Sequence, residues 1–147
     1  METQTKTEVN VQQAVPFFMV SSMEASLRLY VEGLGFEMTK KWTPDGDGKV
    51  RWCWLALGEA ALMLQEFKKD DPRFSSQEGK LGRGVSICFV CKDALAIYRE
   101  ARSRGVDASR PFVGNAMWVT SISDPDGYRI DFESYTDAPE ESVLPED

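Results

Sequence analysis

The fold is decided by a stretch that occurs twice, VPFFMVSSMEASLRLYVEGLG at residues 15–35 and VSICFVCKDALAIYREARSRG at residues 85–105. In each copy an apolar run of strand length leads into an amphipathic helical pattern that ends at a glycine. Val15 and Val85 lie 70 residues apart, and so do Gly35 and Gly105. The spacing therefore predicts a tandem repeat.

Each copy is followed by three further strand-like segments. They are expected at residues 36–42, 50–57 and 60–66 in the first half, and at residues 106–113, 117–123 and 128–135 in the second. One helix per group of four strands is typical of an α+β fold. Because four strands cannot bury both faces alone, we expect two βαβββ modules that form a curled mixed sheet around a central pocket.

The repeat predicts one domain over residues 14–135. Its first module spans about residues 14–67 and its second about residues 84–135, with a polar linker at about residues 68–83. Residues 1–13 are polar and are expected to be a disordered tail, while residues 136–147 form an acidic tail that is expected to be loose.

The charge balance and the histidine count exclude several functions. With 17 basic and 24 acidic residues, the net charge of −7 argues against partners such as nucleic acid or an anionic membrane. The sequence has no histidine, which removes histidine acid–base catalysis and every metal site that needs an imidazole.

Three cysteines, Cys53, Cys88 and Cys91, indicate free thiols and a cytoplasmic location. The polar residues 1–13 lack the apolar segment of a signal peptide, and no apolar run is long enough to span a membrane. Cys88 and Cys91 match C-x-x-C, but they lie in a strand-like run, where residues three apart point to opposite faces. We therefore expect core residues here and neither a redox pair nor a zinc site.

Three motifs carry a family resemblance. They are Val20-x5-Ser26-x3-Tyr30-x3-Leu34-Gly35-Phe36, ALMLQE at residues 61–66, and DPDGYRIDF at residues 124–132. In this order they resemble the vicinal-oxygen-chelate superfamily, which includes glyoxalases, bleomycin-resistance proteins and extradiol dioxygenases. The resemblance covers about residues 14–135.

The resemblance implies four metal-ligand positions, which fall on Val15, Met63, Val85 and Asp131. Three of these side chains are apolar and cannot bind a hard cation, so we expect no metal and no cofactor. An alternative oxygen-donor set is Gln65, Asp131 and Glu133, which face the same way in the expected strands.

The resemblance also places a set of side chains on the pocket face. These predicted ligand-binding residues are Phe17, Trp42, Trp52, Trp54, Met63, Gln65, Val85, Ile87, Asp131 and Glu133, with Phe89 beside Ile87. For residues 117–123 two registers stay open, with either Met117, Val119 and Ser121 or Trp118 and Thr120 facing inward. The tryptophans are alternatively plain core residues, and Asp131 and Glu133 are alternatively paired to Arg51, Arg83 or Arg129.

Apolar walls with sparse polar groups are typical of a small-molecule site. We expect metal-independent binding, or sequestration, of a small aromatic or cationic organic molecule, similar to antibiotic resistance by bleomycin-resistance proteins, in a homodimer. One alternative is a lyase, isomerase or dioxygenase of the glyoxalase type with an altered carboxylate/amide site. A second is a metal-free enzyme in which Asp131 or Glu133 acts as a general base, and a third is a structural or partner-binding role.

Overall fold

The computed structural model describes residues 9–77 and 80–146. The first half contains β1 (Phe17–Val20), α1 (Met23–Leu27), η2 (Arg28–Gly33), β2 (Glu37–Trp42), β3 (Trp52–Leu57) and β4 (Ala60–Glu66). After the short helix η3 (Ser75–Gln77), the second half contains β5 (Ser86–Val90), α2 (Ala94–Ser103), β6 (Phe112–Gly114), β7 (Met117–Ser123) and β8 (Arg129–Tyr135). The parts of the predicted tails and linker at residues 1–8, 78–79 and 147 lie outside the described residues.

Two four-stranded sheets have the same strand order. Sheet 1 runs β1-β4-β3-β2 and sheet 2 runs β5-β8-β7-β6. In each sheet the first strand pairs in parallel with the last, and the other pairs are antiparallel. The predicted α+β class and tandem βαβββ order are therefore confirmed.

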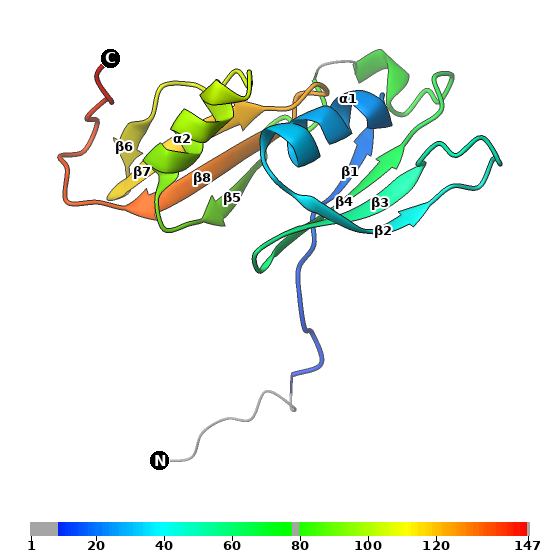
Figure 1. The fold of residues 1–147 in the computed structure, drawn as a ribbon, viewed down its shortest axis with the longest axis horizontal. Coiled ribbons are helices and arrows are strands. Elements are labelled where there is room, and N and C mark those ends of the chain that lie inside the picture. The colour runs from blue at the N-terminus through cyan, green and yellow to red at the C-terminus, as the bar shows by residue number, and fades with distance from the viewer. Residues whose placement is uncertain (1–8, 78–79, 147) are drawn as a thin grey trace.

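The two sheets are separate and lie side by side without closing around a pocket (Figure 1). Helices α1 and α2 lie on the same side of the molecule, in front of their sheets in this view. We call the sheet surface beneath the helix the covered face and the opposite surface the open face. The two open faces therefore look in the same direction and do not face each other.

Local sequence signals explain both helices. Ser22 accepts a hydrogen bond from the Ala25 N–H at the start of α1, and Asp93 accepts one from Ala96 at the start of α2. The chain continues from α1 into η2, whose helical turn is wider than that of an α-helix. The Leu34 N–H donates to the Leu29 carbonyl, five residues back. The covered faces are apolar, and their fully buried side chains include Leu55, Leu62, Leu64, Ile130 and Phe132.

Buried polar contacts join the two modules at one junction. The Tyr30 hydroxyl of η2 donates to the Asp124 carboxylate at 2.9 Å, and both residues are buried. Asp126 accepts from the backbone N–H of Ser21, and Tyr128 stacks on Phe18 with ring centroids 4.0 Å apart. The turn that connects β7 to β8 therefore also holds the second module against the first.

Two predictions about the second half need correction. The strand expected at residues 106–113 is confined to β6, because Ala108 makes only an isolated bridge to Ile122. The segment after Thr136, expected to be loose, runs along β6, where Val113 exchanges backbone hydrogen bonds with Glu141 and Ser142. Within residues 9–77 and 80–146, no helix has the length and apolar character needed to cross a membrane.

Candidate functional site

The open face of sheet 1 carries an aromatic and thioether surface. Across the strands, one row joins Phe17, Met63, Trp54 and Lys40, and the next joins Met19, Gln65, Trp52 and Trp42. Cross-strand neighbours share a face, so six of the predicted ligand-binding residues lie together here. Trp42 is 51% exposed and Phe17 is 48% exposed, whereas Trp52, Trp54, Met63 and Gln65 are half-buried.

Lys40 also belongs to this surface, although it is not among the predicted ligand-binding residues. Its Nζ lies 5.1 Å from the ring centroid of Trp54, within the range of a cation–π contact. Lys40 lies two residues before Trp42, and residues two apart in a strand face the same way. This spacing is the signal in the sequence that could have identified Lys40. Met38 has the same spacing from Lys40, but a register shift between Met38 and Lys40 turns Met38 to the covered face beside Leu55.

The open face of sheet 2 is polar. Asp131 lies between Cys88 and Ser121, and Glu133 lies between Val90 and Val119. This pairing decides the open question about β7, because Ser121 and Val119 face the same way as Asp131 and Glu133. Trp118 and Thr120 instead face α2, where the Thr120 hydroxyl donates to the Ala94 carbonyl at 2.8 Å.

Ile87 and Phe89 do not lie on this open face. They pair with Ile130 and Phe132 on the covered face and pack against the core. The expectation that they share a face with Asp131 and Glu133 is therefore wrong, because adjacent strand residues alternate between faces. Val85 precedes β5 and is 59% exposed.

Asp131 is held by a polar cluster on the open face of sheet 2. Its Oδ1 accepts a hydrogen bond from the Ser121 hydroxyl at 2.6 Å and one from Arg129 Nε at 3.0 Å. Asp131 is only 4% exposed, so the guanidinium compensates a buried carboxylate. Of the three arginines considered as partners, Arg129 pairs with Asp131, and Arg51 pairs with other carboxylates.

Glu133 and Cys88 form the second polar group on this face. Burial first, and then a hydrogen bond to Glu133, raise the pKa of the Cys88 thiol to about 12. A thiol with so high a pKa is a weak nucleophile at neutral pH. Cys53, Cys88 and Cys91 are all free cysteines, and burial raises the pKa of Cys53 to about 11.

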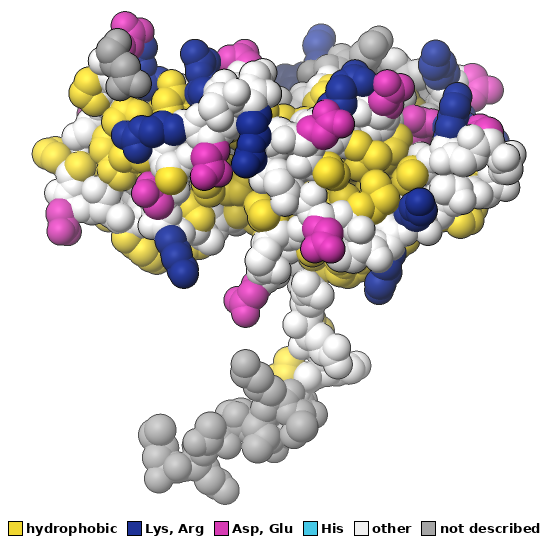
Figure 2. Space-filling view, in the orientation of Figure 1, with side chains coloured by type: hydrophobic (Ala, Val, Ile, Leu, Met, Phe, Trp, Pro, Cys, Tyr) yellow, Lys and Arg dark blue, Asp and Glu magenta, His cyan; other side chains and the backbone are white. Residues whose placement is uncertain are grey.

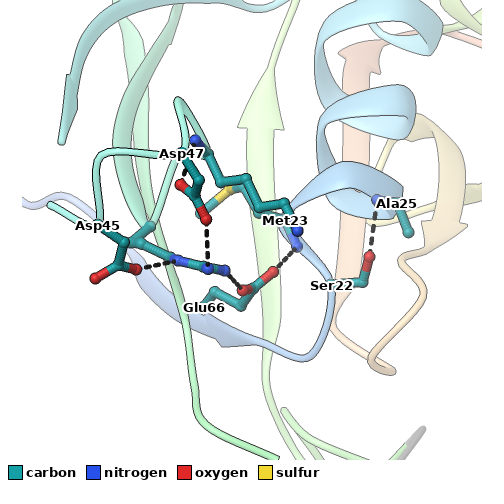
Figure 3. A network of polar contacts seen from close by, with 8 residues as sticks. Ser22, Met23, Ala25, Asp45, Asp47 and Glu66 are labelled. Carbon is teal, nitrogen blue, oxygen red and sulfur yellow. Dashed lines mark hydrogen bonds and ion pairs between the residues drawn. The ribbon is translucent and has the colours of Figure 1, made fainter. Parts of the chain in front are cut away.

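A groove of about 1410 Å³ opens at the end of sheet 1 where β2 and β3 are joined. Met19, Trp42 and Gln65 reach it from the open face. Arg51 fixes its wall, since it pairs with Asp45 at 3.0 Å, with Asp47 at 3.5 Å and with Glu66. Glu66 also accepts from the Met23 N–H at the start of α1 (Figure 3), so the β2–β3 loop is tied to the helix.

The positions that the resemblance assigns to a metal do not fit one. Val15, Met63 and Val85 have no donor atom for a hard cation, and the fourth residue, Asp131, is engaged by Ser121 and Arg129. In the described part of the chain, no three acidic, cysteine or histidine side chains are placed to hold a metal ion.

Tyr30 and Asp124 belong to two different quoted motifs, and nothing in the sequence pattern indicates that they pair. Burial, and then the charge of Asp124, raise the pKa of Tyr30 well above its ordinary value. Burial also raises the pKa of Asp124, against the backbone N–H of Tyr128 and the Tyr30 hydroxyl, which lower it. This pair contacts neither open face and acts on the arrangement of the modules.

Solved structures with this fold include proteins that bind antibiotics. TnmS3, an antibiotic binding protein from Streptomyces sp. CB03234, has 23% identity and a TM-score of 0.62, over 85% of this chain and 98% of that one. The bleomycin-binding protein from Streptomyces verticillus, complexed with copper(II)-bleomycin, has 17% identity and a TM-score of 0.63, over 87% and 99%. A glyoxalase/bleomycin resistance protein/dioxygenase from Nocardioides has 16% identity and a TM-score of 0.62, over 95% of both chains.

The tandem βαβββ modules, each with one open sheet face, define the fold class of this protein. The family is given by a match of its sequence to a family model. Residues 12–132 match the model of the Glyoxalase/Bleomycin resistance protein/Dioxygenase superfamily. This chain belongs to that family, as its motifs indicated. A comparison with curated proteins gave no match.

Proposed function

We propose that the protein binds a planar aromatic organic molecule on the open face of sheet 1 and sequesters it without chemical conversion. The observation that carries this proposal is the pair of cross-strand rows containing Trp42, Trp52 and Trp54. Indole rings stack on planar ligands and bury large apolar areas at little entropic cost. The antibiotic-binding and bleomycin-binding proteins of the same fold support the assignment.

Polar groups beside this aromatic surface would orient the bound ligand. Gln65 offers an amide between Met19 and Trp52 within the aromatic rows. On sheet 2, Glu133 offers a half-buried carboxylate, while Asp131 is already neutralised by Arg129. Glu133 is therefore the stronger candidate to meet a basic group of the ligand.

The proposed assembly is a homodimer in which sheet 2 of one copy covers sheet 1 of the other. Large apolar side chains on the open faces are solvent-exposed in the single chain, including Phe17, Trp42, Val90, Phe112 and Tyr135. Exposed apolar surface of this extent is typical of an interface or a ligand groove. Free cysteines fit a reducing compartment, so the cytoplasm is the proposed location.

An enzymatic reaction on the bound molecule is less well supported than sequestration. Asp131 Oδ1 already accepts hydrogen bonds from the Ser121 hydroxyl and from Arg129 Nε, so this carboxylate is engaged within the protein. Three of the four metal-ligand positions carry apolar side chains and the fourth, Asp131, is engaged by Ser121 and Arg129, so no step is assigned to a metal. Sequestration needs only the aromatic surface that the chain presents.

Titration calorimetry with a panel of planar aromatic antibiotics, bleomycin included, tests the proposal. A binding compound should lose about tenfold in affinity in Trp54→Leu, which removes a stacking contact from the open face. Trp118→Leu is the matched control, since Trp118 lies on the covered face. Binding that survives Trp54→Leu, or micromolar affinity for no member of the panel, would exclude this site.

A further inference from the structure

A cavity of about 490 Å³ lies between the two modules. Its walls come from the end of η2, the β3–β4 turn, β5, α2 and β8. The apolar lining residues include Leu34, Leu57, Phe89, Ile97, Ala101 and Phe132. Phe89 and Phe132 belong to the covered face of sheet 2, so the cavity lies on the opposite side of the sheets from the proposed site. Its volume is in the range of small-molecule pockets.

The cavity is an opening into the apolar core. Phe132 and Ala101 are fully buried at its wall, while Leu57, Phe89 and Ile97 pack against the core and yet stay half-buried. These three side chains remain partly accessible because nothing from either module fills the space. An apolar body of matching size would remove this surface from water.

Close contacts beside the cavity fix the distance between its two walls. A side chain at Gly33 would meet Val106 of the second module at 2.6 Å, so only glycine allows this approach. Arg104 reaches from α2 and donates from Nη1 to the Gly33 carbonyl at 3.3 Å. The walls are thus positioned by contacts between modules that do not depend on a ligand.

Charged groups at the rim of the cavity favour a cation. Glu59 comes from the β3–β4 turn and Glu100 from α2, and both side chains are exposed. Over residues 9–77 and 80–146, neither carboxylate forms an ion pair. Among the described residues that line the cavity, Arg104 alone is basic, and its guanidinium donates to the Gly33 carbonyl. Figure 2, which looks onto this side, shows charged side chains with apolar ones exposed between them.

We propose that this inter-module cavity is a second binding site, which takes a small organic amine with an apolar body. The body lies against Leu57, Phe89 and Ile97, and the ammonium group meets Glu59 and Glu100. The site is independent of the aromatic surface on sheet 1. Occupation of it would bridge the two modules beside their junction.

Calorimetry on the full chain with three probes of one size tests the charge preference. The probes are 1-naphthylmethylamine, 1-naphthylmethanol and 1-naphthoate, which differ in charge. The amine should bind most tightly and the carboxylate least. The double variant Glu59→Gln/Glu100→Gln should weaken the amine about fivefold and leave the alcohol unchanged. Glu24→Gln, which removes a carboxylate from α1, is the control and should change neither.

Alkylation of Cys91 locates the bound probe, because Cys91 lines the cavity. In a Cys88→Ser background, 1-naphthylmethylamine should slow the reaction of Cys91 with iodoacetamide, and Ile97→Trp should abolish this protection by filling the cavity. Protection should persist in Trp54→Leu, which separates this site from the one on sheet 1. Equal binding of amine and alcohol, an unchanged affinity in the double glutamate variant, or no protection of Cys91 would overturn the proposal. The glutamate variants decide the matter even if Ile97→Trp fails to fold.

Discussion

Sheet 1 and sheet 2 have the same strand order and similar covered faces, but their open faces differ in chemistry. Sheet 1 presents Trp42, Trp52 and Trp54, whereas the equivalent surface of sheet 2 presents Asp131 and Glu133. The covered faces must stay apolar because each packs beneath a helix. The open faces are free of that constraint, so one repeat can supply stacking surface and the other polar anchors.

The largest effect is expected from neighbouring residues on the two faces of β4. Leu64→Ala should lower the free energy of unfolding by about 3 kcal/mol, because it empties a fully buried position. Met63→Ala, on the open face, should cost less than about 1 kcal/mol. Urea denaturation measures both changes. Equal losses of unfolding free energy in the two variants would show that the covered and open faces of sheet 1 do not differ in burial.

The junction between the sheets should respond next. Tyr30→Phe should lower the free energy of unfolding by about 2 kcal/mol, because it removes a buried hydrogen bond to a carboxylate. Tyr128→Phe is the control, since its hydroxyl donates to the neutral Met19 carbonyl, and it should cost about 1 kcal/mol. A larger loss of unfolding free energy in Tyr128→Phe than in Tyr30→Phe would contradict the role given to the Asp124 carboxylate at the junction.

The same tyrosine predicts a loss of stability in alkali. The folded state raises the pKa of Tyr30, mainly through burial, so the unfolded chain releases this proton first as the pH rises. The stabilisation is complete below the ordinary tyrosine pKa of about 10 and is lost as the pH rises toward the folded value. Urea denaturation across this window should show a smaller decline in Tyr30→Phe. Identical pH profiles would exclude Tyr30 as the cause.

The polar open face of sheet 2 should contribute less. Asp131→Asn keeps the shape but removes the charge that Arg129 and Ser121 contact, and should cost about 1 kcal/mol of unfolding free energy. Glu133→Gln, which lacks such an arginine contact, should be close to neutral. If Glu133→Gln is the more costly variant, then Glu133 and not Asp131 has the structural role on this face.

The smallest effect concerns the cation on sheet 1. Lys40→Gln removes the ammonium group over Trp54, so a positively charged aromatic ligand should bind about threefold tighter. A neutral ligand of the same shape should bind with unchanged affinity. Calorimetry with such a pair measures the difference, and a loss of affinity for both would indicate that Lys40 itself contacts the ligand.

Local signals were enough for most elements and for one half of the candidate site. The limits of β4 and β7 match the predicted segments, and Ser22 and Asp93, which are typical helix-capping residues, cap α1 and α2. The prediction that Trp52 and Trp54 share a face is confirmed by the pairing of β3 with β4. These features depend on neighbours within a few residues, and the sequence displays those neighbours directly.

Errors arose where the answer depends on partners distant in the sequence. Ile87 and Phe89 form an apolar run that fits either face of β5, and only pairing with Ile130 and Phe132 places them beneath α2. Residues 106–113 have strand-like composition, but β6 covers only Phe112–Gly114, because Ala108 finds only an isolated bridge to Ile122. No local pattern contains that information.

The sequence by itself determined the repeat, the α+β order of elements and the apolar side chains at three of the four metal-ligand positions, because periodicity and donor chemistry are properties of single segments. The tertiary structure alone decided that the two sheets stand side by side, that Tyr30 meets Asp124, and that a cavity remains between the modules. These features depend on how surfaces distant in the sequence fit together, which the packing of the whole chain fixes.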